Sequence, residues 1–155
     1  MSKMYALSGV RAAYLCGPMQ LIEDLRSVCP PWSVSLQGQM AACEALKAED
    51  YYRARWDETH QLREELHEQL ERLGWDVVPG CANFLQCHLP PDAPETAKLL
   101  RQLRKRGLFL RDVANMGTRF DSRTLRIAVK DRATNAAMIR IITATLAHMA
   151  LRRAA

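Results

Sequence analysis

The most informative segment of the sequence lies at its start and reads Ser2-Lys3-Met4-Tyr5-Ala6-Leu7-Ser8-Gly9-Val10-Arg11-Ala12-Ala13-Tyr14. A lysine is followed eight residues later by an arginine, with a turn of small residues between them. Gly9 permits a tight backbone turn there. The run over residues 10–16 is short and apolar and ends at Gly17-Pro18, a pattern that predicts a buried strand.

The lysine and the arginine together suggest a site for an anionic cofactor. A lysine amine forms a Schiff base with a carbonyl group, and pyridoxal phosphate is the commonest cofactor held in that way. Arg11 offers a planar fork of donors to the phosphate, and Ser2 offers a hydroxyl. The spacing alone leaves an alternative open, in which Lys3 is a terminal residue without a role and Arg11 is an exposed strand residue.

The composition is that of a soluble globular protein. Of the 155 residues, 48% are hydrophobic and 25% are charged, which excludes global disorder. No apolar run approaches the roughly 20 residues that span a bilayer, and the first residues do not form a signal peptide. The five cysteines are never spaced C-x-x-C, so we expect neither a disulfide scaffold nor a metal site. These features predict a cytoplasmic protein with no membrane partner.

The net charge of +5 raises the question of nucleic-acid binding. The basic residues are interleaved with acidic ones over residues 58–72, and no aromatic side chains recur among them to stack on bases. The densest basic block, residues 101–106, is typical of the last turns of a helix, where cations favour the dipole. We therefore expect solvated charged faces and no nucleic-acid partner.

The remaining sequence alternates helices and strands. Helices are predicted over residues 19–28, 34–46, 50–73, 95–106 and 131–152, and strands over residues 75–78, 83–88, 108–111 and 124–129. The helix over 50–73 would be on the order of 35 Å long, which suggests an element that bridges two domains. The order of elements after residue 50 predicts a two-layer α+β domain with helices on a small sheet. Cys81 and Cys87 are expected to be core cysteines.

The opening segment as a whole resembles the lysine segment of the fold-type I pyridoxal-phosphate enzymes, especially the histidinol-phosphate aminotransferase group of the class I/II aminotransferases. That group has Ser-Lys, then Leu-x-Gly-x-Arg, then Tyr; here these are Ser2-Lys3, Leu7-Ser8-Gly9-Val10-Arg11 and Tyr14. The resemblance implies that Lys3 is the catalytic residue, which carries pyridoxal 5'-phosphate and transfers the substrate proton. It implies that Ser2 and Arg11 hold the cofactor phosphate.

Four later motifs follow in the order of the same family: Trp32-Ser33-Val34-Ser35, Ala82-Asn83-Phe84-Leu85, Gly107-Leu108-Phe109-Leu110-Arg111-Asp112, and Leu125-Arg126-Ile127-Ala128-Val129 with Asn135. The resemblance implies that Arg126 binds the substrate α-carboxylate through two hydrogen bonds, and that Arg111 contacts a substrate phosphate. Each arginine has the alternative of a strand residue that reaches the surface. Relatives often have a glycine where this chain has Lys130, which departs from the subfamily pattern.

The resemblance also implies a division of the chain into two parts. Residues 49–155, with the helix over 50–73, would be the C-terminal α+β domain of the fold, with a mostly antiparallel sheet under helices. Residues 1–48 would be a remnant of the large cofactor domain. In the family the phosphate loop, the aromatic that stacks on the ring and the Asp at the pyridine nitrogen precede the lysine. We therefore expect a C-terminal portion that is inactive by itself and homodimeric when full length.

Three functions remain open from the sequence. The first is transamination of an amino acid or an amino-acid phosphate such as histidinol phosphate, with 2-oxoglutarate or glutamate as the second substrate. The second is decarboxylation of a phosphoamino acid by an enzyme of the same family. The third is a non-catalytic α+β binding module that keeps an aminotransferase-like fold.

Overall fold

The structure, a computed structural model, describes residues 1–118 and 120–154 of the chain. They form two compact units, of which the first comprises Met1–Asp57 and the second begins at Glu58. Helix α3 (Glu49–Glu71) starts in the first unit and ends in the second. Of the described helices, none is both long enough and apolar enough to cross a membrane.

The first unit contains a short 3-10 helix, η1 (Ser8–Val10), then α1 (Met19–Val28), α2 (Leu36–Lys47) and the start of α3. The helices predicted from the sequence are confirmed, since their observed bounds lie within two residues of the expected ones. The hydroxyl of Ser35 caps α2 by accepting a hydrogen bond from the backbone N–H of Gly38 at 3.1 Å. A Cβ on Gly38 would lie 3.2 Å from the backbone oxygen of Val10, so glycine permits the close approach of η1 to α2, and a larger residue would push the two apart by a few tenths of an ångström.

The strand predicted over residues 10–16 is wrong. Val10 ends η1, Arg11 has a left-handed backbone with φ 57°, and the chain from there to α1 is irregular. A strand needs a neighbouring strand for its backbone hydrogen bonds, and none of the described residues of the first unit is in a strand. Within this segment Ala12 is buried, whereas Tyr14 and Leu15 are exposed.

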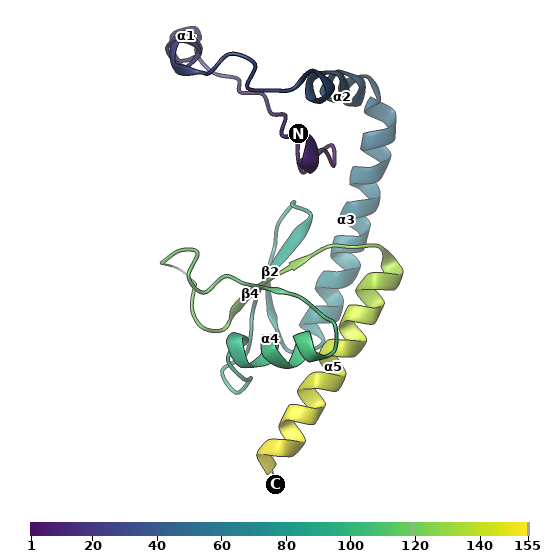
Figure 1. The fold of residues 1–155 in the computed structure, drawn as a ribbon. Coiled ribbons are helices and arrows are strands. Elements are labelled where there is room, and N and C mark those ends of the chain that lie inside the picture. The colour runs from purple at the N-terminus through teal and green to yellow at the C-terminus, as the bar shows by residue number, and fades with distance from the viewer. Residues whose placement is uncertain (119, 155) are drawn as a thin grey trace. The chain divides into compact units, whose positions relative to one another are not determined.

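The second unit is a four-stranded antiparallel sheet covered by helices, as the sequence predicted (Figure 1). The elements are β1 (Asp76–Val78), β2 (Phe84–His88), α4 (Thr96–Lys105), β3 (Arg111–Asp112), β4 (Thr124–Ala128) and α5 (Arg132–Ala154). The strand order is β1-β2-β4-β3, so the two central strands, β2 and β4, are not consecutive in the chain. The antiparallel α+β architecture is confirmed.

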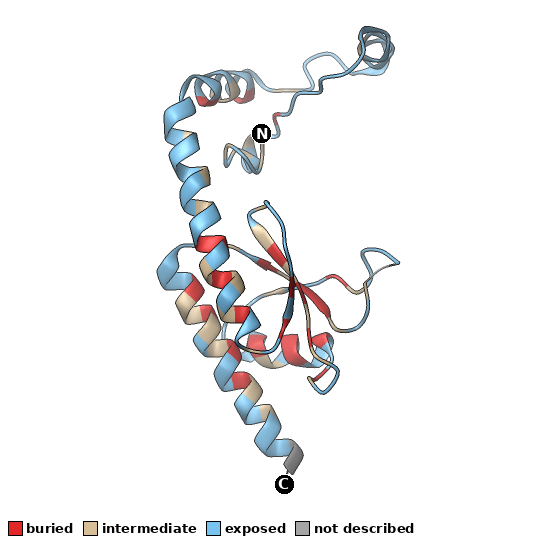
Figure 2. Cartoon of the chain, turned by 180° about the vertical axis from the view of Figure 1, so that it is seen from behind, coloured by how far each residue is buried: buried red, intermediate tan, exposed pale blue. Residues whose placement is uncertain are grey.

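The core lies between one face of this sheet and the helices α3, α4 and α5. Burial alternates along β2 and over most of β4, because successive side chains of a strand point to opposite faces. The inward side chains of the strands pack against leucines of α3 and α4 and against Met138 and Ile142 of α5. Figure 2 shows the buried positions on the sides of these helices and along the central strands.

The two cysteines that were expected in the core differ in their burial. Cys87 on β2 is fully buried, and burial raises the pKa of its thiol to about 12. Cys81 is exposed, so this prediction is wrong for it. The reason is its position in the connection between β1 and β2, where a side chain has no helix to pack against.

The third strand is shorter than predicted and lies later in the chain. Gly107, with φ 78°, ends α4, and the N–H of Leu108 returns to the carbonyl of Leu103 at 3.0 Å. Leu108 and Leu110 then pack against the core instead of pairing with a strand. Of residues 108–112, only 111 and 112 pair with β4.

Candidate functional site

Lys3 lies in a turn at the start of the chain. Aromatic side chains hold this turn against α3. The N–H of Tyr5 donates to the carbonyl of Met1 at 3.0 Å, which closes one turn around the lysine. The indole N–H of Trp56 donates to the carbonyl of Met4 at 2.7 Å. The Tyr5 ring packs edge-on against Tyr52, with 4.9 Å between the ring centroids. The turn is therefore anchored to a helix far along the chain, with the lysine side chain exposed.

Arg11 is directed toward its own loop. Its Nη1 donates to the carbonyl of Ser8 at 3.2 Å, and its side chain is exposed. Within the described part of the chain, no hydrogen bond or ion pair joins Arg11 to Ser2 or Lys3. The three residues that were predicted to hold the cofactor therefore lie in the same unit without a direct contact between them.

Arg111 and Arg126 are brought together by the sheet. The register of β3 and β4 places them directly opposite each other, and Gln86 of β2 lies opposite Arg126 on its other side. The three side chains form a row on the sheet face away from the core, because residues paired across a sheet share a face. We call Gln86, Arg126 and Arg111 the arginine row.

The two arginines of this row have no acidic partner among the described residues. Like charges directly opposite each other on neighbouring strands are destabilising. An anion between the two guanidinium groups would remove that repulsion and would accept charge-assisted hydrogen bonds from both. The arrangement is therefore suited to an anionic ligand.

An aromatic ring orients Arg126. Its guanidinium carbon lies 3.7 Å from the centroid of the Phe84 ring, which is a cation–π contact. Stacking uses the flat face of the guanidinium and leaves the N–H groups at its edge available for hydrogen bonds. Arg126 is half-buried and Arg111 is exposed, so the former is the better fixed of the two.

A hydrogen-bonded chain of polar side chains continues from the arginine row. The Thr124 hydroxyl donates to Oδ1 of Asp121 at 2.8 Å and lies 3.1 Å from Nδ1 of His88. The Nε2 of His88 lies 3.1 Å from the amide nitrogen of Gln86. Since a hydroxyl has one proton and Thr124 gives it to Asp121, the Thr124 oxygen can only accept from Nδ1 of His88 in their contact.

This chain holds Gln86, the first member of the arginine row, in a fixed position. The pKa of Asp121 is lowered, first by the hydrogen bond from the backbone N–H of Arg123 and then by that from Thr124. Gln86, Thr124 and Asp121 were not among the site residues predicted from the sequence. The signal that could have pointed to Gln86 is alternation, because it occupies a position on β2 between two buried residues.

The predicted site residues are thus divided between the two units: Ser2, Lys3 and Arg11 belong to the first, and Arg111 and Arg126 to the second. Among the described residues, no group of three or more His, Cys, Asp or Glu side chains is placed to hold a metal ion.

The chain is similar in sequence to known proteins over most of its length. The family model described as "Aminotransferase class I and II" matches residues 1–142. A curated relative, the histidinol-phosphate aminotransferase of Moorella thermoacetica, is 33% identical over 146 residues, which cover 94% of this chain and 36% of the relative. The chain spans about a third of the length of the curated relatives it matches.

Solved structures show the same fold. The histidinol-phosphate aminotransferase from Clostridium acetobutylicum has a TM-score of 0.86 at 24% identity, covering 94% of this chain and 43% of that one. The L-threonine-O-3-phosphate decarboxylase from Porphyromonas gingivalis has a TM-score of 0.74 at 22% identity, covering 94% of this chain and 44% of that one.

Proposed function

The chain belongs to the class I and II aminotransferase family, and from this premise we propose that it supplies the lysine and the substrate-binding arginines of a pyridoxal-phosphate-dependent aminotransferase. The proposal rests mainly on the arginine row, in which two arginines paired across β3 and β4 lack an acidic partner among the described residues. Such a pair favours an anion, and amino acids and 2-oxo acids both carry one.

Pyridoxal 5'-phosphate fits the donor set of the first unit. The Lys3 amine is exposed and pairs with no carboxylate in the described residues, so it is free to reach a carbonyl group. The Ser2 hydroxyl and the Arg11 guanidinium are suited to a phosphate, provided that Arg11 leaves its hydrogen bond to Ser8. When bound, pyridoxal phosphate would supply an electron sink for the electrons of the substrate's Cα–H bond. Lys3 would accept the proton of that bond and return it.

Arg126 orients the substrate by its anionic group. A carboxylate that accepts two parallel hydrogen bonds from the guanidinium is fixed in both position and rotation. Arg111, one strand away, is placed for a second negative charge on the substrate. Glutamate and 2-oxoglutarate carry two carboxylates, and an amino-acid phosphate such as histidinol phosphate carries a phosphate. We propose that the two substrates use the arginine row in turn.

A second candidate, decarboxylation of a phosphoamino acid, uses the same residues. A substrate with both a carboxylate and a phosphate would also match two neighbouring arginines, and the fold is shared with a threonine-phosphate decarboxylase. The two reactions differ in their products, since transamination yields a 2-oxo acid and decarboxylation yields carbon dioxide. A non-catalytic binding module would give neither product.

The first unit is proposed to be part of a larger cofactor domain. Its helix α1 has no buried residue, and large apolar side chains such as Trp32 (95% exposed) and Met19 (79% exposed) face solvent. Apolar surface of this kind is normally covered by protein. We propose that the rest of a homodimeric enzyme covers it, and that the 155 residues by themselves do not turn over.

Two measurements on the purified chain test the proposal without turnover. In the first, the chain is treated with pyridoxal phosphate and then with borohydride, and the reduced adduct is located by mass spectrometry. We expect modification at Lys3 in preference to the other lysines, and loss of that adduct in Lys3→Ala. Equal labelling of all lysines would contradict the role of Lys3.

The second measurement tests the arginine row. The side-chain N–H signals of Arg111 and Arg126 are followed by NMR as 2-oxoglutarate is added. We expect saturable shifts that are lost in Arg126→Lys and kept in the control Arg140→Lys, which lies on the exposed side of α5. Shifts that persist in Arg126→Lys would refute the assignment.

A further inference from the structure

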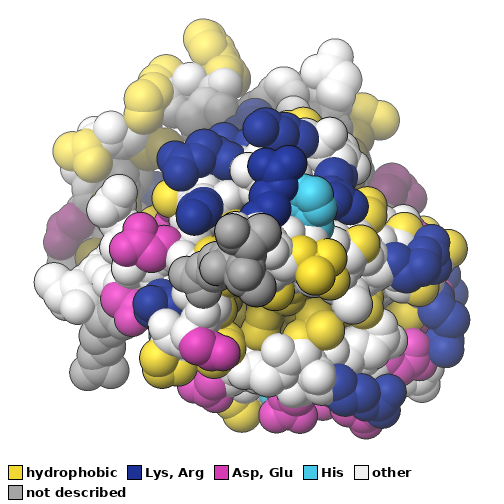
Figure 3. Space-filling model, turned by 90° about the horizontal axis from the view of Figure 1, so that it is seen from below, with side chains coloured by type: hydrophobic (Ala, Val, Ile, Leu, Met, Phe, Trp, Pro, Cys, Tyr) yellow, Lys and Arg dark blue, Asp and Glu magenta, His cyan; other side chains and the backbone are white. Residues whose placement is uncertain are grey.

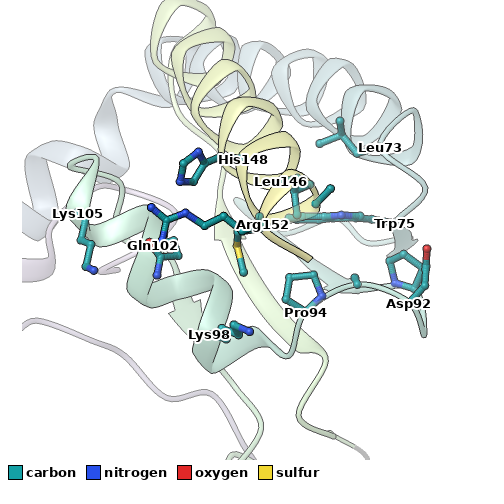
Figure 4. Close-up of a pocket in the computed structure, with 14 residues that line it drawn as sticks. Leu73, Trp75, Asp92, Pro94, Lys98, Gln102, Lys105, Leu146, His148 and Arg152 are labelled. Atoms are coloured by element: carbon teal, nitrogen blue, oxygen red, sulfur yellow. The ribbon is translucent and has the colours of Figure 1, made fainter. Parts of the chain in front are cut away.

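A pocket of about 920 Å³ lies in the second unit, away from the arginine row. Its walls are formed by the turn between α3 and β1, the last turns of α5, one side of α4 and the loop that follows β2. No residue of the arginine row lines it. Its volume falls in the range of about 300–1,000 Å³ that is usual for small-molecule sites. Figure 4 shows the lining side chains.

The floor of the pocket is apolar. Trp75 is 3% exposed and belongs to the core. Leu73, in the turn after α3, and Leu146 and Met149 of α5 pack beside that core. In Figure 4 the Trp75 indole lies flat beneath α5, at the end of the pocket away from Lys105. This floor offers the partly exposed aliphatic side chains of Leu146 and Met149, with the small accessible edge of Trp75 beneath them, to any group that enters.

Arg123, which does not line the pocket, fixes one of its walls through hydrogen bonds. The Nη1 of Arg123 donates to the carbonyl of Pro90 at 3.1 Å and to that of Ala93 at 2.6 Å. Both carbonyls belong to the loop that lines the pocket. The loop is therefore fixed before any ligand binds, which lowers the entropy that binding would cost.

The opposite end of the pocket is cationic. Lys98, Gln102 and Lys105 recur at helical spacing along α4, so they share one side of that helix. Arg152 extends from α5 toward α4 in Figure 4. Figure 3, which looks onto this end of the molecule, shows lysine and arginine side chains gathered beside a hollow with hydrophobic atoms in it.

These cations have no acidic partner in the described part of the chain. Among the described lining residues the single carboxylate is that of Asp92, which Figure 4 places at the end near Trp75 and away from Lys105. The pocket thus has an apolar end and a cationic end. A bound anion would pair with these cations, and an attached apolar body would cover the floor.

We propose that this pocket binds a small amphipathic organic anion, with its carboxylate, sulfonate or phosphate head at Lys105, Gln102 and Arg152 and its aromatic or branched aliphatic body on Trp75, Leu146 and Met149. The site is distinct from the residues proposed for transamination. Its failure would therefore leave the proposed function untouched, and the reverse also holds.

The test is an NMR titration of the 155-residue chain with naphthalene-2-sulfonate, with neutral 2-naphthalenemethanol as the uncharged analogue. The reporter is the indole N–H signal of Trp75, assigned with Trp75→Phe. We expect a saturable shift with the sulfonate and affinity that is about tenfold weaker for the alcohol, because a charge-assisted hydrogen bond is lost. Equal affinity for both compounds would show an apolar cavity without anion selectivity and would overturn the proposal.

Charge variants locate the head group. Lys105→Gln with Arg152→Gln should weaken sulfonate binding about tenfold or more, and Gln102→Glu should weaken it through repulsion. The matched control is Arg101→Gln with Arg104→Gln, which removes two charges from α4 at residues that do not line the pocket. The control should keep its affinity within about twofold. An equal loss in the control pair, or no loss in the pocket variants, would refute the proposed site.

Discussion

Arg126→Lys is the substitution that most directly probes how the protein would hold its substrate. Lysine keeps the positive charge but offers a point charge on a flexible stem in place of a planar fork. In the structure the fork is stacked 3.7 Å from the Phe84 ring centroid and lies opposite Arg111. A lysine ammonium would keep part of the attraction to the ring and would lose the second parallel hydrogen bond to a carboxylate.

The expected size of the effect follows from these two losses. One charge-assisted hydrogen bond contributes about 1.5–3 kcal/mol, and the stacking on Phe84 at a half-buried position contributes roughly another 0.5–1 kcal/mol. A loss of about 2–4 kcal/mol in transition-state binding corresponds to roughly a 30- to 1,000-fold fall in kcat/KM for the amino donor. The assay is steady-state transamination by the complete enzyme that contains this chain.

The same experiment separates substrate binding from cofactor binding. Arg126→Lys should leave the absorbance of the bound cofactor unchanged, since the ring and strand partners of Arg126 belong to the second unit and Lys3 belongs to the first. Arg11→Lys should do the reverse and weaken retention of the cofactor first. Arg140→Lys, on the exposed side of α5, is the control and should change neither. If kcat/KM for every amino donor is unchanged in Arg126→Lys, Arg126 is a surface strand residue and the reasoning is wrong.

Three further predictions concern stability and reactivity. Thr124→Val should lower the free energy of unfolding, measured in urea, by about 1–3 kcal/mol, because it leaves His88 and Asp121 without their shared partner. The control Thr143→Val, at an exposed hydroxyl, should change that free energy by less than about 0.5 kcal/mol. Equal effects of the two substitutions would count against the polar chain. The thiol of Cys87 should resist alkylation in the folded chain while the four exposed cysteines react, and fast labelling of Cys87 would argue against its burial. The free energy of unfolding should fall as pH rises from the ordinary thiol pKa of 9.0 toward the raised pKa of about 12. The reason is that the folded state holds the Cys87 proton more tightly than the unfolded state does. Hydrogen exchange should show strong protection in β2, β4 and the helices over them and weak protection in α1, which has no buried residue; equal protection in both units would contradict this.

Patterns that depend on neighbouring residues were readable without the structure. The helices α1, α3 and α5 were predicted from apolar residues at helical spacing, and α4 from the proline before it and the glycine that ends it. The strands β2 and β4 were predicted from short runs of strand-forming residues. The buried Cys87 lies within one of those runs. The predictions that were wrong concern segments whose structure depends on residues far away in the chain. Residues 10–16 have the composition of a strand but find no strand to pair with, and Leu108 and Leu110 enter the core where a strand was expected.

The candidate site shows the same limit. The lysine segment and the two arginines were recognisable as motifs, because a motif is a local string. Their neighbours were not: Gln86, His88 and Asp121 join a single polar chain through residues far apart in the sequence. The attachment of the Lys3 turn to α3 through Trp56 also spans 52 positions of the chain.

By itself the sequence determined the family, the two-layer α+β class and the identity of the charged residues that serve as site candidates. Those properties depend on local spacing, because the period of the apolar residues distinguishes a helix from a strand within a few residues of sequence. The tertiary structure alone decided that Arg111 faces Arg126, that β2 and β4 are central neighbours, and that a cationic pocket forms between α4 and α5. The register and order of strands are chosen by the packing of the whole sheet on its helices, because a slip of one residue would move every buried side chain to the solvent face.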